Sequence, residues 1–143
     1  MLTFPILSTI IALPLIGAIL AIFIKGNENE VSKNVRDLAL WFSLAELILV
    51  FFLIFQFEPN SDKYQFVEKI VLLNKYQISY FLGIDAISLI FICLTAILVP
   101  LCIYYVKYSI KIRIKEFIVA FLILQAVIMG VFCSLDIILF YIF

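Results

Sequence analysis

The sequence predicts an all-α polytopic membrane protein with four transmembrane helices and the start of a fifth. Of its 143 residues, 66% are hydrophobic and only 14% are charged, whereas soluble domains are roughly half apolar and about a quarter charged. The apolar residues also form continuous runs of about 20, the length of a helix that crosses the hydrocarbon core. These runs do not alternate with polar residues as barrel strands do. We therefore expect a single membrane domain over residues 1–143.

Runs without charged side chains place the individual spans. We expect spans at about 2–24, 37–57, 85–107 and 116–134, with a fifth beginning at 136–143. The first run has no basic segment before it and no small-residue cleavage site after it, so we interpret it as a retained span rather than a signal peptide. The last eight residues would extend only about 12 Å as a helix. We therefore expect the chain to be the front part of a longer subunit.

The polar connections predict the orientation of the chain. The connections at 25–36 and 107–115 are short and rich in lysine and arginine, whereas the longer loop at 58–84 balances its lysines with acidic residues. Basic connections face the cytoplasm. We therefore expect a multi-pass protein with its N-terminus and the 58–84 loop on the outer side.

The outer loop itself has a strand-like pattern. Residues 65–73 and 76–82 are rich in β-branched and aromatic side chains, and Asn74-Lys75 separates them. This pattern predicts a short hairpin between spans two and three, lying on the outer face of the membrane.

Composition excludes several kinds of site. The chain has no histidine, which excludes histidine-ligated haem, a Ser-His-Asp triad and the usual zinc sites. Its three cysteines have no paired spacing, so neither a disulfide framework nor a metal site is expected. No glycine-rich nucleotide fingerprint is present, and the net charge is zero. We expect no metal, no cofactor, no direct nucleotide binding and no nucleic-acid partner for this chain, and a lipid bilayer around it.

Two aspartates precede apolar runs. Asp85 and Asp136 stand where a carboxylate accepts hydrogen bonds from the first free amides of a helix and complements its dipole, so we interpret both as N-caps. Gly83 would allow the chain to turn into the helix without a steric penalty. A role for Asp85 in binding a partner or guiding protons is the alternative.

Glu46 is the acidic residue near the middle of the second span. A carboxyl group there should be protonated or face the bundle interior, and an intramembrane acid is by default a functional candidate. Ser43, one turn away, is a possible partner for a neutral acid, and proton relay is the functional alternative. Gln125 and Thr95 are expected to make interhelical hydrogen bonds, and Gly130 to permit close helix approach.

One motif resembles a known family. The GIDAIS stretch at 83–88, followed by apolar spacing to Pro100, resembles the GxDGIS signature of the proton-pumping membrane subunits of respiratory NADH-quinone oxidoreductase. Residues 66–70 and 78–83 resemble the outer loop of the chain M family, whose mitochondrial counterpart is NADH dehydrogenase subunit 4, and 125–143 resemble its approach to the fifth helix. Ala86 stands where the family has a second glycine.

The resemblance implies a proton-translocating subunit in the membrane arm of a respiratory complex, in a bacterial cell membrane or the mitochondrial inner membrane. NADH, FMN, iron–sulfur clusters and quinone would act elsewhere in the complex, and other membrane-arm subunits would be the partners. The family's key glutamate of the fifth helix would lie past Phe143, so no catalytic residue is carried over. Gly83, Asp85, Ser88 and Asp136 match motif positions and imply roles in shaping the fold. The alternatives are a subunit of a multisubunit cation/proton antiporter, or a truncated, non-transporting membrane scaffold or remnant.

Overall fold

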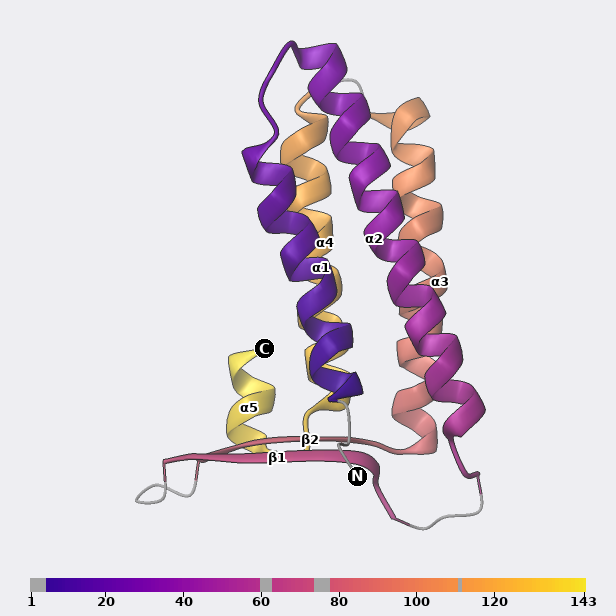
Figure 1. Cartoon of the computed structure of the whole chain (residues 1–143), viewed down its shortest axis with the longest axis vertical. Helices are drawn as coiled ribbons and strands as arrows, with labels where there is room; N and C mark the ends of the chain where they lie inside the picture. The colour runs from indigo at the N-terminus through magenta and orange to yellow at the C-terminus, as the bar shows by residue number, and fades with distance from the viewer. Residues whose placement is uncertain (1–4, 60–62, 74–77, 111) are drawn as a thin grey trace.

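The computed structural model describes residues 5–59, 63–73, 78–110 and 112–143 (Figure 1). The elements, in chain order, are α1 (Ile6–Phe23), α2 (Glu28–Gln56), β1 (Gln65–Leu73), β2 (Ile78–Ile84), α3 (Ala86–Ser109), α4 (Ile114–Cys133) and α5 (Ile137–Ile142). Four of these helices are long and apolar enough to cross a membrane. The predicted fold class is therefore confirmed.

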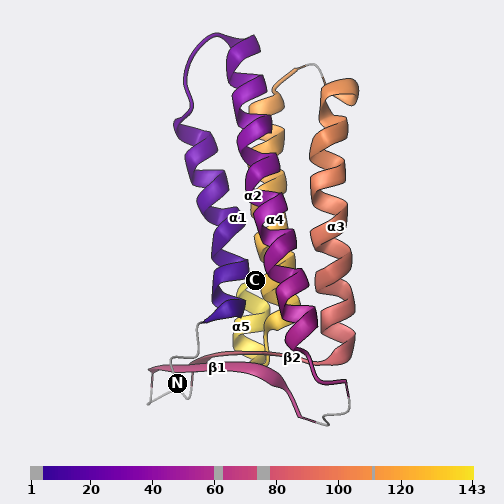
Figure 2. The same cartoon turned by 45° about the vertical axis from the view of Figure 1, so that its right-hand side comes forward.

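The four long helices form a bundle in which the chain runs up and down. Figures 1 and 2 show α1 and α3 on opposite sides, with α2 and α4 between them, and α2 contacts each of the other three long helices. The α1–α2 and α3–α4 connections lie at one end of the bundle, and the hairpin crosses the other end. We call these the basic end and the hairpin end. The bundle thus presents two chemically different ends.

The second helix begins well before the predicted residue 37. It starts at Glu28, and Glu28 and Glu30 lie in its first turn. Acidic side chains at a helix start stabilise the helix dipole, and the following stretch contains good helix formers such as lysine and arginine. A criterion based on apolar runs detects only the apolar part of such a helix, so it misses the polar extension at the basic end.

The predicted hairpin is present. β1 and β2 pair in antiparallel register, from Gln65 opposite Ile84 to Leu73 opposite Ile78, with irregularities between Gln65 and Glu68 and between Val71 and Leu73. The proposed turn at Asn74-Lys75 lies outside the described residues. The α4–α5 connection also bonds to β2: the backbone N–H of Leu135 donates to the carbonyl of Phe81 at 2.9 Å. Backbone pairing therefore ties the hairpin to the bundle.

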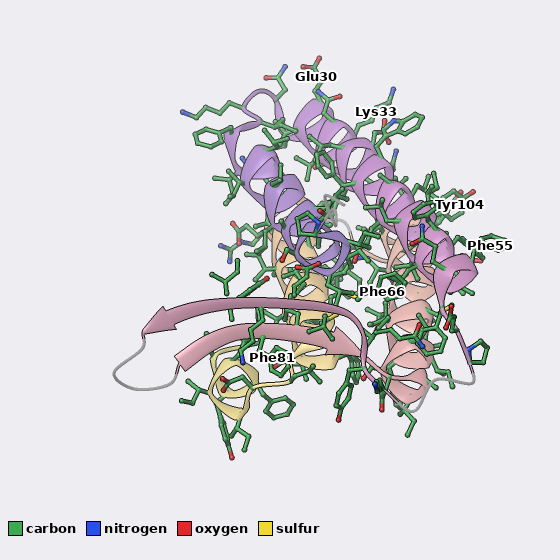
Figure 3. The ribbon with its side chains drawn as sticks, turned by 60° about the horizontal axis from the view of Figure 1, so that its bottom comes forward. Glu30, Lys33, Phe55, Phe66, Phe81 and Tyr104 are labelled. Atoms are coloured by element: carbon green, nitrogen blue, oxygen red, sulfur yellow. The ribbon has the colours of Figure 1, made fainter. Side chains whose placement is uncertain are left out.

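The buried apolar side chains form one cluster toward each end of the bundle. The cluster near the hairpin includes Leu7, Ile10, Leu53, Leu82, Ile84, Ile92, Met129 and Cys133. Phe66 of β1 packs against it, and Figure 3 views the molecule from this end, with Glu30 and Lys33 at the far end. The outward faces of the helices expose many large apolar side chains, as expected of helices surrounded by lipid.

Candidate functional site

Glu46 of α2 and Gln125 of α4 meet in the interior of the bundle. Their exposed fractions are 0% and 1%, and the Gln125 Nε2 donates a hydrogen bond to the Glu46 Oε2. Glu46 lies ten residues before the end of α2 at Gln56, or roughly 15 Å along the helix axis. The carboxyl group faces the bundle interior, and the interhelical hydrogen bond expected of Gln125 is confirmed.

Two other polar side chains bond within their own helices. The Ser43 hydroxyl donates to the carbonyl of Leu40 at 3.0 Å, and the Thr95 hydroxyl donates to the carbonyl of Phe91 at 2.8 Å. The prediction that Ser43 satisfies Glu46 is therefore wrong, as is the prediction of an interhelical bond from Thr95. Short hydroxyl side chains reach the carbonyls of the preceding turn more readily than groups on a neighbouring helix.

The Glu46–Gln125 pair is incompletely satisfied. Among the described residues, Glu46 Oε1 and Gln125 Oε1 are the buried side-chain nitrogen or oxygen atoms without a hydrogen-bond partner. Buried polar atoms in folded proteins are nearly always bonded, so each exception calls for a chemical explanation. Both orphaned atoms are acceptors, and they belong to the two groups that are already joined.

The GIDAIS stretch is organised around Asp85. This residue is the N-cap of α3, and its carboxylate accepts from the backbone N–H of Ser88 at 2.8 Å. The same hydrogen bond holds the pKa of the Asp85 carboxyl below its ordinary value. The capping prediction for Asp85 is confirmed. Ser88 of the motif takes part through its backbone amide, which donates to the Asp85 carboxylate.

Gly83 acts differently from the prediction. It lies within β2, and Gly26, not Gly83, is the glycine with a positive φ among the described residues. A Cβ added at Gly83 would lie 2.6 Å from Leu135 Cδ1 and 3.4 Å from Val67 Cγ2. Gly83 therefore leaves room for the Leu135 side chain of the α4–α5 connection against the hairpin, and it does not form a turn into the helix.

The α4–α5 junction contains two further predicted positions. The Asp136 carboxylate accepts from the backbone N–H of Ile138 at 2.8 Å and caps α5 as expected. Gly130 of α4 permits a close approach, since an added Cβ would lie 2.6 Å from Phe143 Cδ1. The structure brings Gly83, Gly130 and Asp136 to the region where α5 meets β2 and α4.

Sequence reasoning missed a polar cluster at the start of α1. Glu68 of β1 accepts from the backbone N–H of Leu7 at 2.8 Å and from the backbone N–H and hydroxyl of Ser8. The Tyr80 hydroxyl lies 3.1 Å from the Ser8 hydroxyl, and burial raises the pKa of Tyr80 above its ordinary value. The N-cap of α1, Pro5, makes no side-chain cap bond. Two features of the sequence could have indicated this contact: the apolar first helix has no capping side chain of its own, and Glu68 is an acid within an apolar strand.

The opposite end of α1 has a similar partner. The Lys115 Nζ donates to the carbonyls of Ile22 and Ile24, each at 2.7 Å. An acid at the N-terminus of a helix and a base at its C-terminus both complement the helix dipole. α1 is thus held at each end by a charged residue from a distant part of the chain.

Similarity to known proteins extends over nearly the whole chain, including the residues described above. No protein-family model matches the chain. It is 39% identical over 137 residues, 96% of its length, to NADH-ubiquinone oxidoreductase chain 4 of Marchantia polymorpha, and 39% identical over 137 residues to that of Arabidopsis thaliana. Over 143 residues it is 34% identical to NADH-quinone oxidoreductase subunit M of Rickettsia prowazekii (strain Madrid E). Over nearly its whole length the chain is therefore similar to proteins named NADH-ubiquinone oxidoreductase chain 4 or NADH-quinone oxidoreductase subunit M.

The match covers nearly all of this chain but less than a third of each of these relatives. The chain spans 27% of the length of the Marchantia and Arabidopsis chain 4 proteins and 29% of the Rickettsia subunit M. The Rickettsia alignment covers 100% of this chain, so Glu46, the GIDAIS stretch and Asp136 all lie within the similarity to subunit M. The predicted resemblance of the chain to this family is confirmed.

Proposed function

We propose that this chain contributes to proton translocation as a membrane-arm subunit of NADH-quinone oxidoreductase. The observation that carries the proposal is the 34–39% identity over nearly the whole chain to proteins named as subunits of that oxidoreductase. The four helices long and apolar enough to span a membrane are the type of structure that this role requires. In this proposal the chain couples proton movement to electron transfer and carries no redox centre itself.

Coupling requires protonatable groups inside the membrane. An isolated charge at the centre of a bilayer is costly, so proton pathways use acids buried in the protein interior. Glu46 meets this description, because it is fully buried and accepts a hydrogen bond from another helix. NADH, FMN, iron–sulfur clusters and quinone would be handled by other subunits of the complex. The remaining membrane-arm subunits and the bilayer would surround the exposed apolar faces.

The two ends of the bundle support an orientation. The α1–α2 and α3–α4 connections lie at the same end of the bundle (Figure 1). Basic residues occur in or beside them: Lys25 before α2, Lys33 and Arg36 in the first turns of α2, and Arg113 and Lys115 at the start of α4. Basic connections favour the cytoplasmic side, which is the matrix side for a mitochondrial protein. We therefore propose that the N-terminus and the hairpin lie on the outer side of a bacterial cell membrane or of the mitochondrial inner membrane.

Co-migration in native gels tests this function. Membranes are dissolved in mild detergent, complexes are separated by native electrophoresis, and the chain is located by mass spectrometry beside a stain for NADH oxidation. We expect the chain in the band that oxidises NADH. Migration in an ion-transport complex without NADH oxidation would instead favour a cation/proton antiporter subunit. Absence from both would favour a non-transporting scaffold.

The role of Glu46 is tested in the intact complex. We expect Glu46→Gln to reduce NADH-driven acidification of vesicles, measured with a fluorescent pH probe, because the amide cannot release a proton. Ser43→Ala is the matched control, since Ser43 is buried in the same helix but bonds only to the Leu40 carbonyl in the described structure. Normal assembly with unchanged acidification in Glu46→Gln would remove Glu46 from the proton path.

A further inference from the structure

The two orphaned oxygens of the Glu46–Gln125 pair share one chemical need. A carboxylate offers acceptors only, whereas a carboxamide has one donor group and one acceptor. The amide nitrogen of Gln125 already donates to Glu46 Oε2. What remains is Glu46 Oε1 and Gln125 Oε1, two acceptors with no donor among the described residues. A single additional proton would supply the missing donor.

The chemistry of the two groups decides where that proton belongs, because a carboxylate oxygen binds a proton far more readily than an amide oxygen does. If it resides on Glu46 Oε1, the resulting O–H is a donor available to Gln125 Oε1, while the Gln125 N–H continues to donate to Glu46 Oε2. Two parallel hydrogen bonds then join a carboxylic acid to an amide, and every polar atom of both groups has a partner. Buried polar networks are stable when they are fully satisfied and costly when they are only partly satisfied.

In the described part of the structure, the helices packed against α2 bring no positive charge to Glu46 that would hold it as an anion. The spans Ile6–Phe23 and Ala86–Val106 contain no charged residue. On α4 the charged residues, Lys115 and Glu116, lie at the first turn, and Lys115 is bonded to α1 carbonyls. Cys133 is a buried titratable group within electrostatic reach of Glu46, and it adds no positive charge. A buried carboxylate without a cationic partner favours its neutral form.

We propose that Glu46 and Gln125 form a proton-binding pair, with the proton on Glu46 Oε1 and Gln125 as the positioning residue. Uptake forms the Oε1–H bond with a proton from hydronium and leaves water. Release breaks that bond, leaves the electron pair on the carboxylate and returns the proton to water. The pair is independent of the oxidoreductase assignment, whereas the use of its proton in translocation rests on the proposed function.

Infrared difference spectroscopy on the full-length protein tests the pair. The protein is purified from its native membrane in whatever assembly it forms, so the measurement does not presuppose a complex. We expect wild type at neutral pH to show the C=O stretching band of a protonated carboxyl that is absent from Glu46→Gln. In that variant two amides replace the acid and amide, and each can donate to the other. Loss of the band is therefore expected without loss of folding.

Two further variants test Gln125. Gln125→Met has a similar length and no polar amide, so the Glu46 carboxyl loses its hydrogen bonds and its C=O band should shift to higher wavenumber. The exchanged double variant Glu46→Gln/Gln125→Glu restores one acid and one amide across the same two helices. It should recover a protonated-carboxyl band, and this result remains informative if Gln125→Met does not fold.

Specific results would overturn the proposal. If Glu46→Gln removes no protonated-carboxyl band at neutral pH, Glu46 is ionised and the pair does not bind a proton. If the band has the same position in folded Gln125→Met as in wild type, or the exchanged variant shows none, Gln125 is not the partner. If the bands behave as expected but Glu46→Gln acidifies vesicles normally, the pair stands and its use in translocation is rejected.

Discussion

At the scale of single residues, three carboxylates of this chain bond to the starts of helices. Asp85 accepts from an amide of the first turn of α3, Asp136 from one of α5, and Glu68 from two of α1. The first amides of a helix have no partner within the helix, and they lie at the positive end of its dipole. Each of these acids therefore stabilises a helix that would otherwise begin with unbonded donors.

Removing the Asp85 cap should destabilise the start of α3. We expect Asp85→Ala to lower the free energy of unfolding by about 1 kcal/mol, measured by denaturant titration of the detergent-solubilised protein. Asp85→Asn is the matched control, because asparagine caps helices as well as aspartate does. An equal loss in both variants would contradict the capping role and point to a need for the charge itself.

The Asp85 cap should also be sensitive to acid. Its folded-state pKa lies below the ordinary value because the backbone N–H of Ser88 donates to the carboxylate. The contribution of the ionised cap is thus fully present above the unfolded pKa of about 3.9, and it is lost as the pH falls through the lower folded pKa. We expect wild type to lose stability relative to Asp85→Asn over that interval. A difference that is independent of pH would contradict this linkage.

The distance along the chain between partners decided which residue roles could be predicted. Asp85 and Asp136 bond to amides two or three residues away, so their caps follow from local sequence. Glu46 was expected to be buried, but its pairing with Gln125 depends on the rotation of α2 against α4, which no local pattern encodes. The role of Glu68 depends on a contact with a residue 61 positions earlier, and it was missed for the same reason.

At the scale of elements, the first helix depends on charges at both of its ends. We expect Glu68→Ala to lower the free energy of unfolding by roughly 1.5–3 kcal/mol, because the Leu7 and Ser8 amides lose a charged acceptor. Glu68→Gln, which keeps one acceptor oxygen, should lose less. Glu30→Ala removes an exposed acid at the far end (Figure 3) that interacts with the dipole of α2, a contribution of about 0.3–1 kcal/mol, and serves as the control for the larger loss expected at Glu68. Equal stability of Glu68→Ala and Glu30→Ala would argue against the end-capping of α1.

The contact between α4 and α5 depends on a glycine. We expect Gly130→Ala to destabilise the protein by about 1–3 kcal/mol, a typical value for overpacking, because the new methyl group would overlap the Phe143 ring. The overlap is removed in Gly130→Ala/Phe143→Ala. Comparing this double variant with Phe143→Ala alone isolates the steric effect, and denaturant titration measures each. A full penalty for Gly130→Ala in the Phe143→Ala background would rule out the ring contact as its cause.

Most elements could be predicted from the sequence, and their tertiary pairings could not. Long apolar runs indicate the membrane helices, and β-branched residues indicate the hairpin. The polar start of α2 was missed because its residues face water. The pairing of Leu135 with Phe81 was also missed, since it joins a helix connection to a strand that lies far away in the sequence.

At the scale of the whole molecule, the basic end and the hairpin end should lie on opposite sides of the membrane. We expect an impermeant maleimide to label Lys33→Cys from the cytoplasmic side and Tyr64→Cys from the outer side, since both native side chains are exposed. Right-side-out and inverted vesicles distinguish the two. Wild type provides the background from Cys93, Cys102 and Cys133. The opposite labelling pattern would reverse the proposed orientation.

The way in which α1 is held also sets an order of events during synthesis. The first helix leaves the ribosome before its partners exist, because Glu68 follows Leu7 by 61 residues and Lys115 follows Ile22 by 93. Until then both of its ends lack those charges. An interruption of translation between Glu68 and Lys115 would therefore leave the start of α1 with its acidic partner and the end of α1 without its lysine.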